Sequence, residues 1–189
     1  MRYEIREIVD VAKHVAKEGM SIVWENIGDP VAKGEAPPTW IKKIVSDAIK
    51  EDSTFAYSPT RGLDETRAYI AHERNLEKGI QITPDDILFF NGLGDAISHI
   101  YRNLNPRTRI LGPDPAYPTH SSAEAAHSDK PHITYKLNPE NGWKPDLTEM
   151  EKKIREYKNI GGILIVNPDN PTGFVYPRET IRAIVALAK

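Results

Sequence analysis

The sequence predicts an α/β protein in which helices cover both faces of a mostly parallel sheet, preceded by a helical N-terminal segment. From residue 83 onward, short apolar runs alternate with helical patterns through short connections, which is typical of parallel sheets. Before about residue 55 the apolar residues recur mostly at helical spacing. We therefore assign residues 1–55 to the helical segment and residues 56–189 to the α/β domain.

Composition describes an ordinary globular protein. The 189 residues are 39% hydrophobic and 28% charged, with a net charge of −2, enough for one well-buried domain or one domain plus part of another. The 25 Lys and Arg are scattered and matched by 27 Asp and Glu, so nucleic acid is not an expected partner. No apolar run has membrane-spanning length and no signal peptide is evident, so we expect a cytoplasmic protein without a membrane partner. The absence of cysteine excludes disulfides and thiolate metal sites.

The helices of the N-terminal part follow from apolar residues spaced three and four positions apart. A first helix is predicted over residues 3–17, closed by Gly19, and a second begins near Thr39 as its cap. A third covers about residues 63–78 and stops at Gly79. The second helix is expected to bury an apolar face made of Trp40, Ile41, Ile44, Val45, Ala48 and Ile49.

The α/β domain is expected to alternate strands and helices to the end of the chain. Buried strands are predicted at residues 87–90, 109–111, 133–137 and 161–166, and helices at about 96–104, 119–126, 147–157 and from Pro177 onward. The helical pattern is still running at Lys189 with no capping glycine after it. We therefore expect the domain to be incomplete at its C-terminal end.

The loop of residues 166–173 (Val-Asn-Pro-Asp-Asn-Pro-Thr-Gly) is the segment of the sequence that says most about function. It leaves the carboxyl end of a predicted buried strand, where ligands sit in open α/β sheets. Its prolines stiffen it and remove backbone donors, and Gly173 permits a positive φ. Asn170 carries an amide that can both donate and accept hydrogen bonds. A rigid turn without a ligand is the alternative for an isolated Asn-Pro-Thr-Gly.

A second glycine-containing segment follows the predicted strand at 87–90. Gly92-Leu93-Gly94 lies between that strand and a helix, so its backbone N–H groups and the helix dipole can hold a phosphate. A dinucleotide is one candidate, because Asp114 lies about 20 residues further on and suits a ribose hydroxyl. Ile97, however, stands where a third small residue should let helix and strand approach. An NAD-dependent dehydrogenase-like domain therefore ranks second.

The motif Asn-Pro-x-Asn-Pro-Thr-Gly at residues 167–173 resembles the signature of the class I/II aminotransferases, the fold-type I enzymes that use pyridoxal phosphate. Further blocks similar to that family occur in order at residues 26–30, 57–67, and 91–97 with 112–118. The resemblance implies the N-terminal part of an enzyme that transfers an amino group between an amino acid and a 2-oxo acid. Residues 1–55 would belong to its small domain and arm, and the rest to a truncated large domain. A fold-type I lyase remains an alternative.

The resemblance also implies which residues hold the cofactor. Gly92, Leu93 and Gly94 would bind its phosphate, Tyr117 would stack on the face of its pyridine ring, and Asn170 would hydrogen-bond its phenolic oxygen. In the family a cis proline turns the adjacent residue toward the ring at two of these places. We therefore predict that Asn170-Pro171 is cis, and also Asp114-Pro115, although only about 5–6% of X–Pro bonds are cis.

Two further roles follow from the resemblance. Tyr57 would reach across the interface of a homodimer to the phosphate of the partner subunit. Gly28 would lie beside the α-carboxylate of the substrate, where Asn170 is also expected.

The catalytic groups of the family are not found in this chain. The lysine that binds the cofactor covalently, the aspartate paired with the pyridine nitrogen and the substrate-binding arginine lie further downstream in the family. Lys136, Lys144 and Lys158 occur in polar segments. We therefore predict that the chain alone is not catalytic.

A metal site is a weaker interpretation of one helix. His120, Glu124 and His127 would share a face of the helix at about 119–126, but three ligands within one helix rarely close a site. We expect no metal, and interpret His120 as support behind the cofactor.

Overall fold

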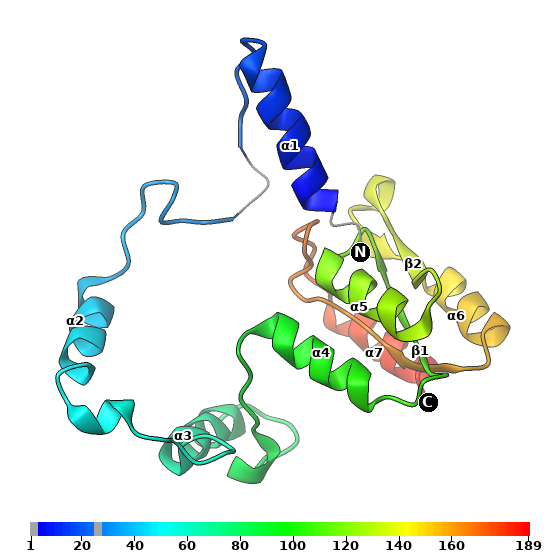
Figure 1. The fold of residues 1–189 in the computed structure, drawn as a ribbon. Coiled ribbons are helices and arrows are strands. Elements are labelled where there is room, and N and C mark those ends of the chain that lie inside the picture. The colour runs from blue at the N-terminus through cyan, green and yellow to red at the C-terminus, as the bar shows by residue number, and fades with distance from the viewer. Residues whose placement is uncertain (1–3, 25–27) are drawn as a thin grey trace. The chain divides into compact units, whose positions relative to one another are not determined.

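The computed structural model describes residues 4–24 and 28–189 (Figure 1). The chain divides into two compact units, one formed by Ile5–Phe89 and one formed mainly by Phe90–Lys189. The α/β unit thus begins at Phe90, and the assignment of residues 56–89 to the same domain stays a prediction. None of the helices in the described ranges is long and apolar enough to cross a membrane.

The first unit is helical. Its elements are α1 (Glu4–Lys17), α2 (Thr39–Ala48), the 3-10 helix η1 (Asp52–Phe55), α3 (Asp64–Asn75) and the 3-10 helix η2 (Pro84–Asp86). Gly19 has a φ of 91° just after α1 and Gly79 a φ of 157° after α3. These conformations suit glycine near the end of a helix, and the three predicted helices exist. Two of their predicted ends are wrong, because Pro38 and not Thr39 is the N-cap of α2, and α3 ends at Asn75, before Gly79.

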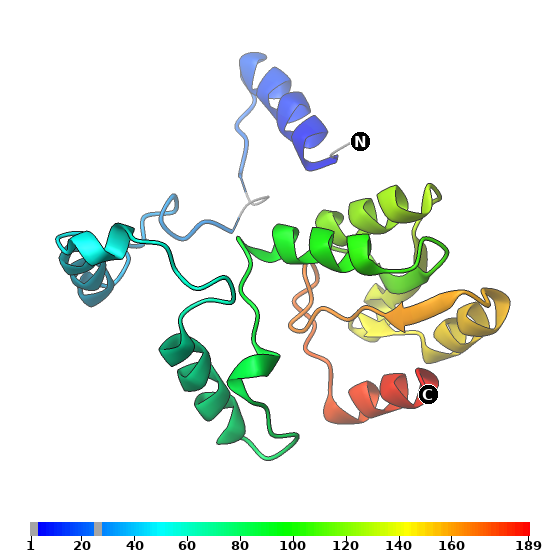
Figure 2. The same ribbon diagram turned by 60° about the horizontal axis from the view of Figure 1, so that its bottom comes forward.

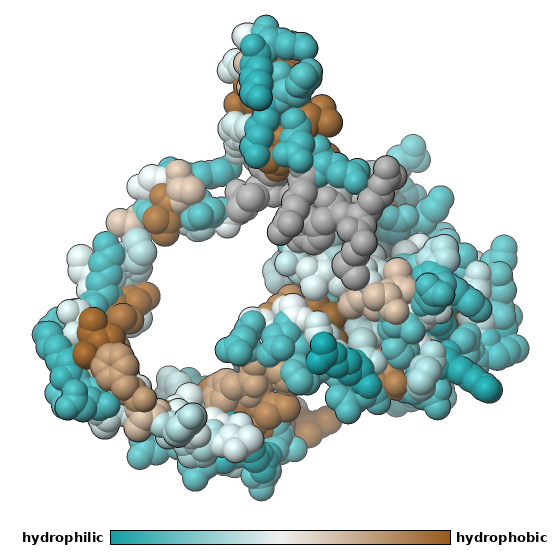
Figure 3. All heavy atoms as spheres, viewed as in Figure 1, coloured by the Kyte–Doolittle hydropathy of each residue, from teal (hydrophilic) through white to brown (hydrophobic). Residues whose placement is uncertain are grey.

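The predicted burial of α2 is wrong for this chain. No residue of α2 is buried, and Trp40 is 63% exposed on its apolar face. Apolar atoms accordingly lie on the surface of this helix in Figure 3. Helical periodicity identifies the face that prefers to be covered but not the element that covers it, and no part of the described chain does so.

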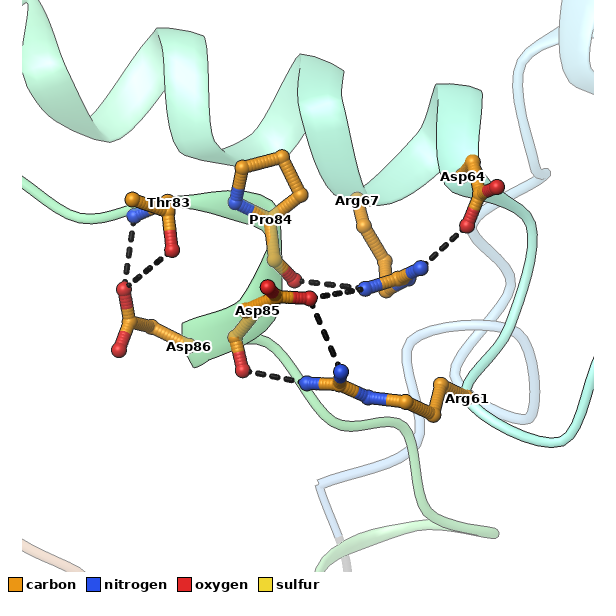
Figure 4. Close-up of polar contacts among 7 residues, drawn as sticks. All are labelled: Arg61, Asp64, Arg67, Thr83, Pro84, Asp85 and Asp86. Atoms are coloured by element: carbon orange, nitrogen blue, oxygen red, sulfur yellow. Dashed lines mark hydrogen bonds and ion pairs between the residues drawn. The ribbon is translucent and has the colours of Figure 1, made fainter.

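A cluster of charged side chains joins α3 to η2 (Figure 4). Arg67 is 7% exposed, and its Nη1 donates to the carbonyl of Pro84 at 2.9 Å and lies 3.5 Å from Asp85 Oδ1. Its Nη2 also pairs with Asp64. Arg61 completes the cluster, since its Nη1 donates to Asp85 Oδ1 at 2.9 Å. Arg67 of the 57–67 block therefore links α3 to η2.

The second unit contains the predicted sheet. Its elements are α4 (Leu93–Asn103), β1 (Arg109–Asp114), α5 (Pro118–Ser128), β2 (Ile133–Asn138), η3 (Pro139–Asn141), β3 (Lys144–Pro145), α6 (Leu147–Glu156), β4 (Ile160–Ile163) and α7 (Arg178–Leu187). The strand order is β3-β2-β1-β4. β1 pairs in parallel with both β2 and β4, whereas β2 and β3 are antiparallel. Helices α4 and α5 lie on one face and α6 and α7 on the other (Figure 2), which confirms the fold class.

The main core of this unit lies between the sheet and helices α6 and α7. Leu111, Tyr135 and Met150 are completely buried there, and Ile133, Leu137, Tyr176 and Ile184 complete the cluster. Each such side chain stabilises the fold by roughly 1.5–3 kcal/mol relative to an exposed one. The alternating burial of β2 places Ile133, Tyr135 and Leu137 on this face.

Two strand predictions need correction. Residues 87–90 form no strand, and Leu88 is 58% exposed, because a strand requires a neighbouring strand to complete its hydrogen bonds and none in the described ranges pairs with it. β4 covers Ile160–Ile163 and is partly exposed, not fully buried over residues 161–166. It is an edge strand of this sheet, so one of its sides has no strand beside it.

Candidate cofactor site

Two of the predicted site residues lie at one edge of the sheet because their strands are parallel neighbours. β1 leads through Asp114-Pro115 to Tyr117, and β4 leads to the loop that carries Asn170. The pairing continues beyond β4, since Leu164 N donates to the carbonyl of Leu111 at 2.8 Å. The carboxyl ends of parallel neighbours meet at the same sheet edge. The structure therefore brings the segments of Tyr117 and Asn170 to that edge.

The peptide bonds at this edge agree with the sequence analysis. Asn170-Pro171 and Asp114-Pro115 are both cis, as predicted. Asn167-Pro168 is also cis, which was not predicted.

Tyr117 is the N-cap residue of α5, directly before Pro118 in the first turn. Its ring is half-buried and lies edge-on to the ring of His120, with 5.8 Å between centroids and an interplanar angle of 75°. One edge of the aromatic ring is thus held by the helix that follows it. This arrangement suits a ring that stacks on a flat ligand.

His120 is buried, and this burial, followed by the nearby imidazole of His132, lowers its pKa from the ordinary value of 6.5. The unfolded chain then binds protons more strongly than the folded protein. The stability from the neutral imidazole is present above about pH 6.5 and is lost as the pH falls through the lower folded-state pKa. In an NMR titration, we expect the His120 ring to titrate below 6.5 and the melting temperature to fall over the same range. A midpoint at or above 6.5 would contradict the lowered pKa of His120.

The other members of the suggested metal cluster have different partners. Glu124 is fully buried and accepts hydrogen bonds from Arg109 Nε at 2.5 Å and from Arg109 Nη2 at 3.1 Å. His127 Nε2 lies 3.1 Å from the carbonyl oxygen of Thr108. These contacts attach α5 to the start of β1. In residues 4–24 and 28–189 no group of three or more His, Cys, Asp or Glu side chains is placed to hold a metal ion.

Gly92, Leu93 and Gly94 form the exposed start of α4. Gly92 is the N-cap residue with a φ of 82°, a conformation that favours glycine. A Cβ on Gly94 would lie 4.0 Å from Thr119 Cγ2, so this helix start lies beside the first turn of α5. First-turn N–H groups have no acceptor within a helix, and they favour an anion. The geometry fits a phosphate group.

Asp95, also in the first turn of α4, is the charge that would oppose an anion there. Its Oδ2 accepts a hydrogen bond from Asn91 N at 3.1 Å, and its Oδ1 lies 3.5 Å from His99 Nε2. The carboxylate thus contacts the backbone of Asn91, before the helix, and the side chain of His99, one turn further on.

A hollow of about 310 Å³ opens between the end of β1 and the start of β2. Its polar lining comes from Asp114, Ser121, Ser122, His132 and Thr134. The segment that carries Tyr117 therefore borders a space with hydroxyl groups and an imidazole.

Gly28 and Tyr57 belong to the helical unit. Gly28 is exposed, with no atom within 4 Å of an added Cβ, and Tyr57 is fully exposed in the segment between η1 and α3. Their roles stay predictions. Residues 26 and 27 of the block at 26–30 lie outside the described residues.

A pair of buried phenols, those of Tyr135 and Tyr176, was not predicted from the sequence. Tyr135 Oη donates to the carbonyl of Leu164 at 3.0 Å and lies 3.4 Å from Tyr176 Oη. Burial first, and also the charge of Asp169, raise the pKa of both tyrosines, so the hydroxyls stay protonated. The signal for Tyr135 was its inward place in the alternating strand at 133–137. Tyr176 carried no comparable signal.

The comparisons with known proteins agree with this geometry. The family model of class I and II aminotransferases matches residues 25–189. An aminotransferase of Methanocaldococcus jannaschii, described as uncharacterized, is 54% identical over 188 residues, covering 100% of this chain and 44% of that protein. The glutamate-pyruvate aminotransferase AlaA of Escherichia coli is 32% identical over 99% of this chain and 45% of its own length. The chain belongs to the class I and II aminotransferase family.

Solved structures show the same similarity. An alanine aminotransferase from Pyrococcus furiosus superposes with a TM-score of 0.85 at 32% identity, over 99% of this chain and 47% of that chain. The chain thus spans less than half the length of these relatives. This family uses pyridoxal phosphate in general, acts on amino and keto acids and is typically dimeric. The membership leaves the dehydrogenase alternative without support.

Proposed function

We propose that the chain is the N-terminal part of a pyridoxal-phosphate-dependent aminotransferase and supplies part of its cofactor-binding surface. The observation that carries the proposal is the parallel pairing of β1 with β4, because it brings Tyr117 and the loop of Asn170 to one sheet edge. The start of α4 lies beside α5, the helix that Tyr117 caps. The longer polypeptide that contains this chain is called the full-length enzyme below.

Each residue of the site has a distinct binding task in this proposal. The backbone N–H groups of Leu93 and Gly94 receive the phosphate, Tyr117 lies against the ring, and the Asn170 amide donates to the phenolic oxygen. When bound, pyridoxal phosphate supplies an electron sink for bonds at the amino acid's α-carbon. The chain's own contribution is to fix the orientation of the ring.

The substrates are an amino acid and a 2-oxo acid, with Gly28 and Asn170 beside the substrate carboxylate. The names of the relatives make alanine with 2-oxoglutarate the first pair to test. A cytoplasmic location and a homodimer are part of the same proposal, and they rest on composition and on resemblance.

The test is keto-acid formation by the full-length enzyme. It is supplied with a panel of amino acids and 2-oxoglutarate, with and without pyridoxal phosphate. We expect transfer that depends on the cofactor. Elimination products without amino transfer would instead favour the lyase alternative.

Tyr57 is proposed to serve the phosphate of the partner subunit. In the full-length enzyme we expect Tyr57→Phe to weaken retention of pyridoxal phosphate about tenfold, the effect of losing one hydrogen bond to a charged group. The melting temperature of the cofactor-free variant should not change, because Tyr57→Phe keeps the aromatic ring and removes only the hydroxyl. Gel filtration with pyridoxal phosphate measures retention, and Tyr69→Phe, another exposed tyrosine, is the control. Equal retention in both variants would remove Tyr57 from the site.

A further inference from the structure

Asp169 is a buried charge in an otherwise exposed loop. It is 4% exposed, whereas Pro168 and Asn170 on either side are exposed. Its Oδ1 is buried and has no hydrogen-bond partner among the described residues. Burying a carboxylate with an unused oxygen costs free energy that an apolar side chain would not. A reason other than core packing is therefore needed for an aspartate at this place.

The other carboxylate oxygen closes the turn that contains Asn170. Asp169 Oδ2 accepts hydrogen bonds from Thr172 Oγ1 at 2.6 Å and from Thr172 N at 3.1 Å. The Thr172 hydroxyl in turn accepts from Phe174 N at 3.2 Å. The carboxylate thus bridges the two residues between it and Thr172, which are Asn170 and Pro171.

The backbone of Asp169 adds a second closure. Its N–H donates to the carbonyl of Phe174 at 2.8 Å, and its carbonyl accepts from Gly173 N at 2.9 Å. Pro171 has no N–H with which to stabilise the turn. The contacts of Asp169 with Thr172, Gly173 and Phe174 therefore hold the backbone before and after Asn170. The side chain of Asn170 itself stays exposed.

We propose that Asp169 is a positioning residue, which holds the 169–174 turn so that the Asn170 amide is presented to pyridoxal phosphate. The inference rests on the proposed function, since Asn170 is taken to contact the cofactor. Asp169 acts through the turn and does not touch the cofactor. The hydrogen bonds to Thr172 carry the effect, so a neutral side chain that still accepts them should preserve it.

The chain offers a matched control. Asp146 caps α6, and its Oδ1 accepts a hydrogen bond from Glu149 N, three residues further on, at 3.0 Å. Like the hydrogen bond from Thr172 N to Asp169, this one joins an aspartate carboxylate to the backbone N–H three residues further on, within the same unit. It lies, however, at the N-terminus of α6. Asp146→Ala therefore measures the loss of such a contact without an effect on Asn170.

The experiment uses the full-length enzyme freed of cofactor. Hydrogen exchange of the peptide spanning residues 166–175, the dissociation constant for pyridoxal phosphate and the melting temperature are measured. We expect Asp169→Ala to speed exchange in this peptide and raise the dissociation constant about tenfold. Asp169→Asn should restore both within about twofold, because its carbonyl still accepts from Thr172. Asp146→Ala should lower the melting temperature without changing the dissociation constant.

The outcomes separate this inference from the proposed function. If Asp169→Ala speeds exchange but leaves the dissociation constant unchanged, the positioning role is wrong. If Asp169→Ala does not fold, Thr172→Val removes the hydroxyl and keeps the carboxylate; unchanged affinity in that variant also overturns the inference. Asn170→Ala is the control for the function itself. Unchanged cofactor affinity and visible spectrum in that variant would contradict the contact between Asn170 and the cofactor.

Discussion

Residues 1–189 purified alone are expected to form no keto acid above the background of free pyridoxal phosphate. Amino transfer needs a lysine amine that binds the cofactor covalently and moves a proton. Such an amine must be desolvated or electrostatically tuned to be nucleophilic near neutral pH. Lys136, Lys144 and Lys158 are all exposed. The sheet edge provides binding groups without a reacting amine.

The assay supplies the chain with pyridoxal phosphate and a panel of amino acids and follows keto-acid formation. The full-length enzyme under the same conditions is the positive control. Turnover by the chain alone above the free-cofactor rate would show that one of its lysines has been misjudged.

The second large effect is expected at the buried pair of Arg109 and Glu124. Glu124→Ala leaves the Arg109 guanidinium, which is 6% exposed, without its carboxylate. Breaking a buried ion pair in this way costs about 3–5 kcal/mol. Arg109 Nη2 would keep only its 2.6 Å hydrogen bond to the carbonyl of Pro131. The start of β1 would therefore be held less firmly to α5.

Urea unfolding of the cofactor-free full-length enzyme, followed by tryptophan fluorescence, to which Trp143 beside the core contributes, measures the loss in free energy of unfolding. The control is Glu151→Ala, which removes an exposed pair with Arg155 whose length is also 2.5 Å and should cost less than about 1 kcal/mol. The double variant Arg109→Met with Glu124→Leu should recover part of the stability, because no charge is left buried. Equal midpoints for the two single alanine variants would contradict the importance of burial.

The sequence predicted most helices and the parallel strands because their apolar periodicity is local. It also predicted the cis bonds at Asn170-Pro171 and Asp114-Pro115, which depended on the family resemblance. It failed for residues 87–90 and for the apolar face of α2, because strand pairing and burial depend on a neighbour that periodicity does not identify.

The residues that the sequence proposes for contact with cofactor or substrate are exposed or half-buried, whereas the buried Asp169 and the two buried phenols were not proposed. Asn170, Tyr117 and Gly92 occur in recognisable motifs. Asp169 looks like an ordinary loop residue in the sequence, and only its contacts with Thr172 and its burial show what it does. The hydroxyl of Tyr135 contacts Leu164 and Tyr176, which lie far along the chain. No local pattern could therefore reveal that the two phenols form a pair.

The most direct test of the proposed site is equilibrium titration of the cofactor-free full-length enzyme with pyridoxal phosphate and, separately, with NADH. We predict saturable binding of pyridoxal phosphate and no binding of NADH, with the affinity for pyridoxal phosphate reduced in Asn170→Ala and in Tyr117→Ala. Saturable binding of NADH, or an affinity for pyridoxal phosphate that neither substitution changes, would contradict a cofactor site at the carboxyl edge of β1 and β4.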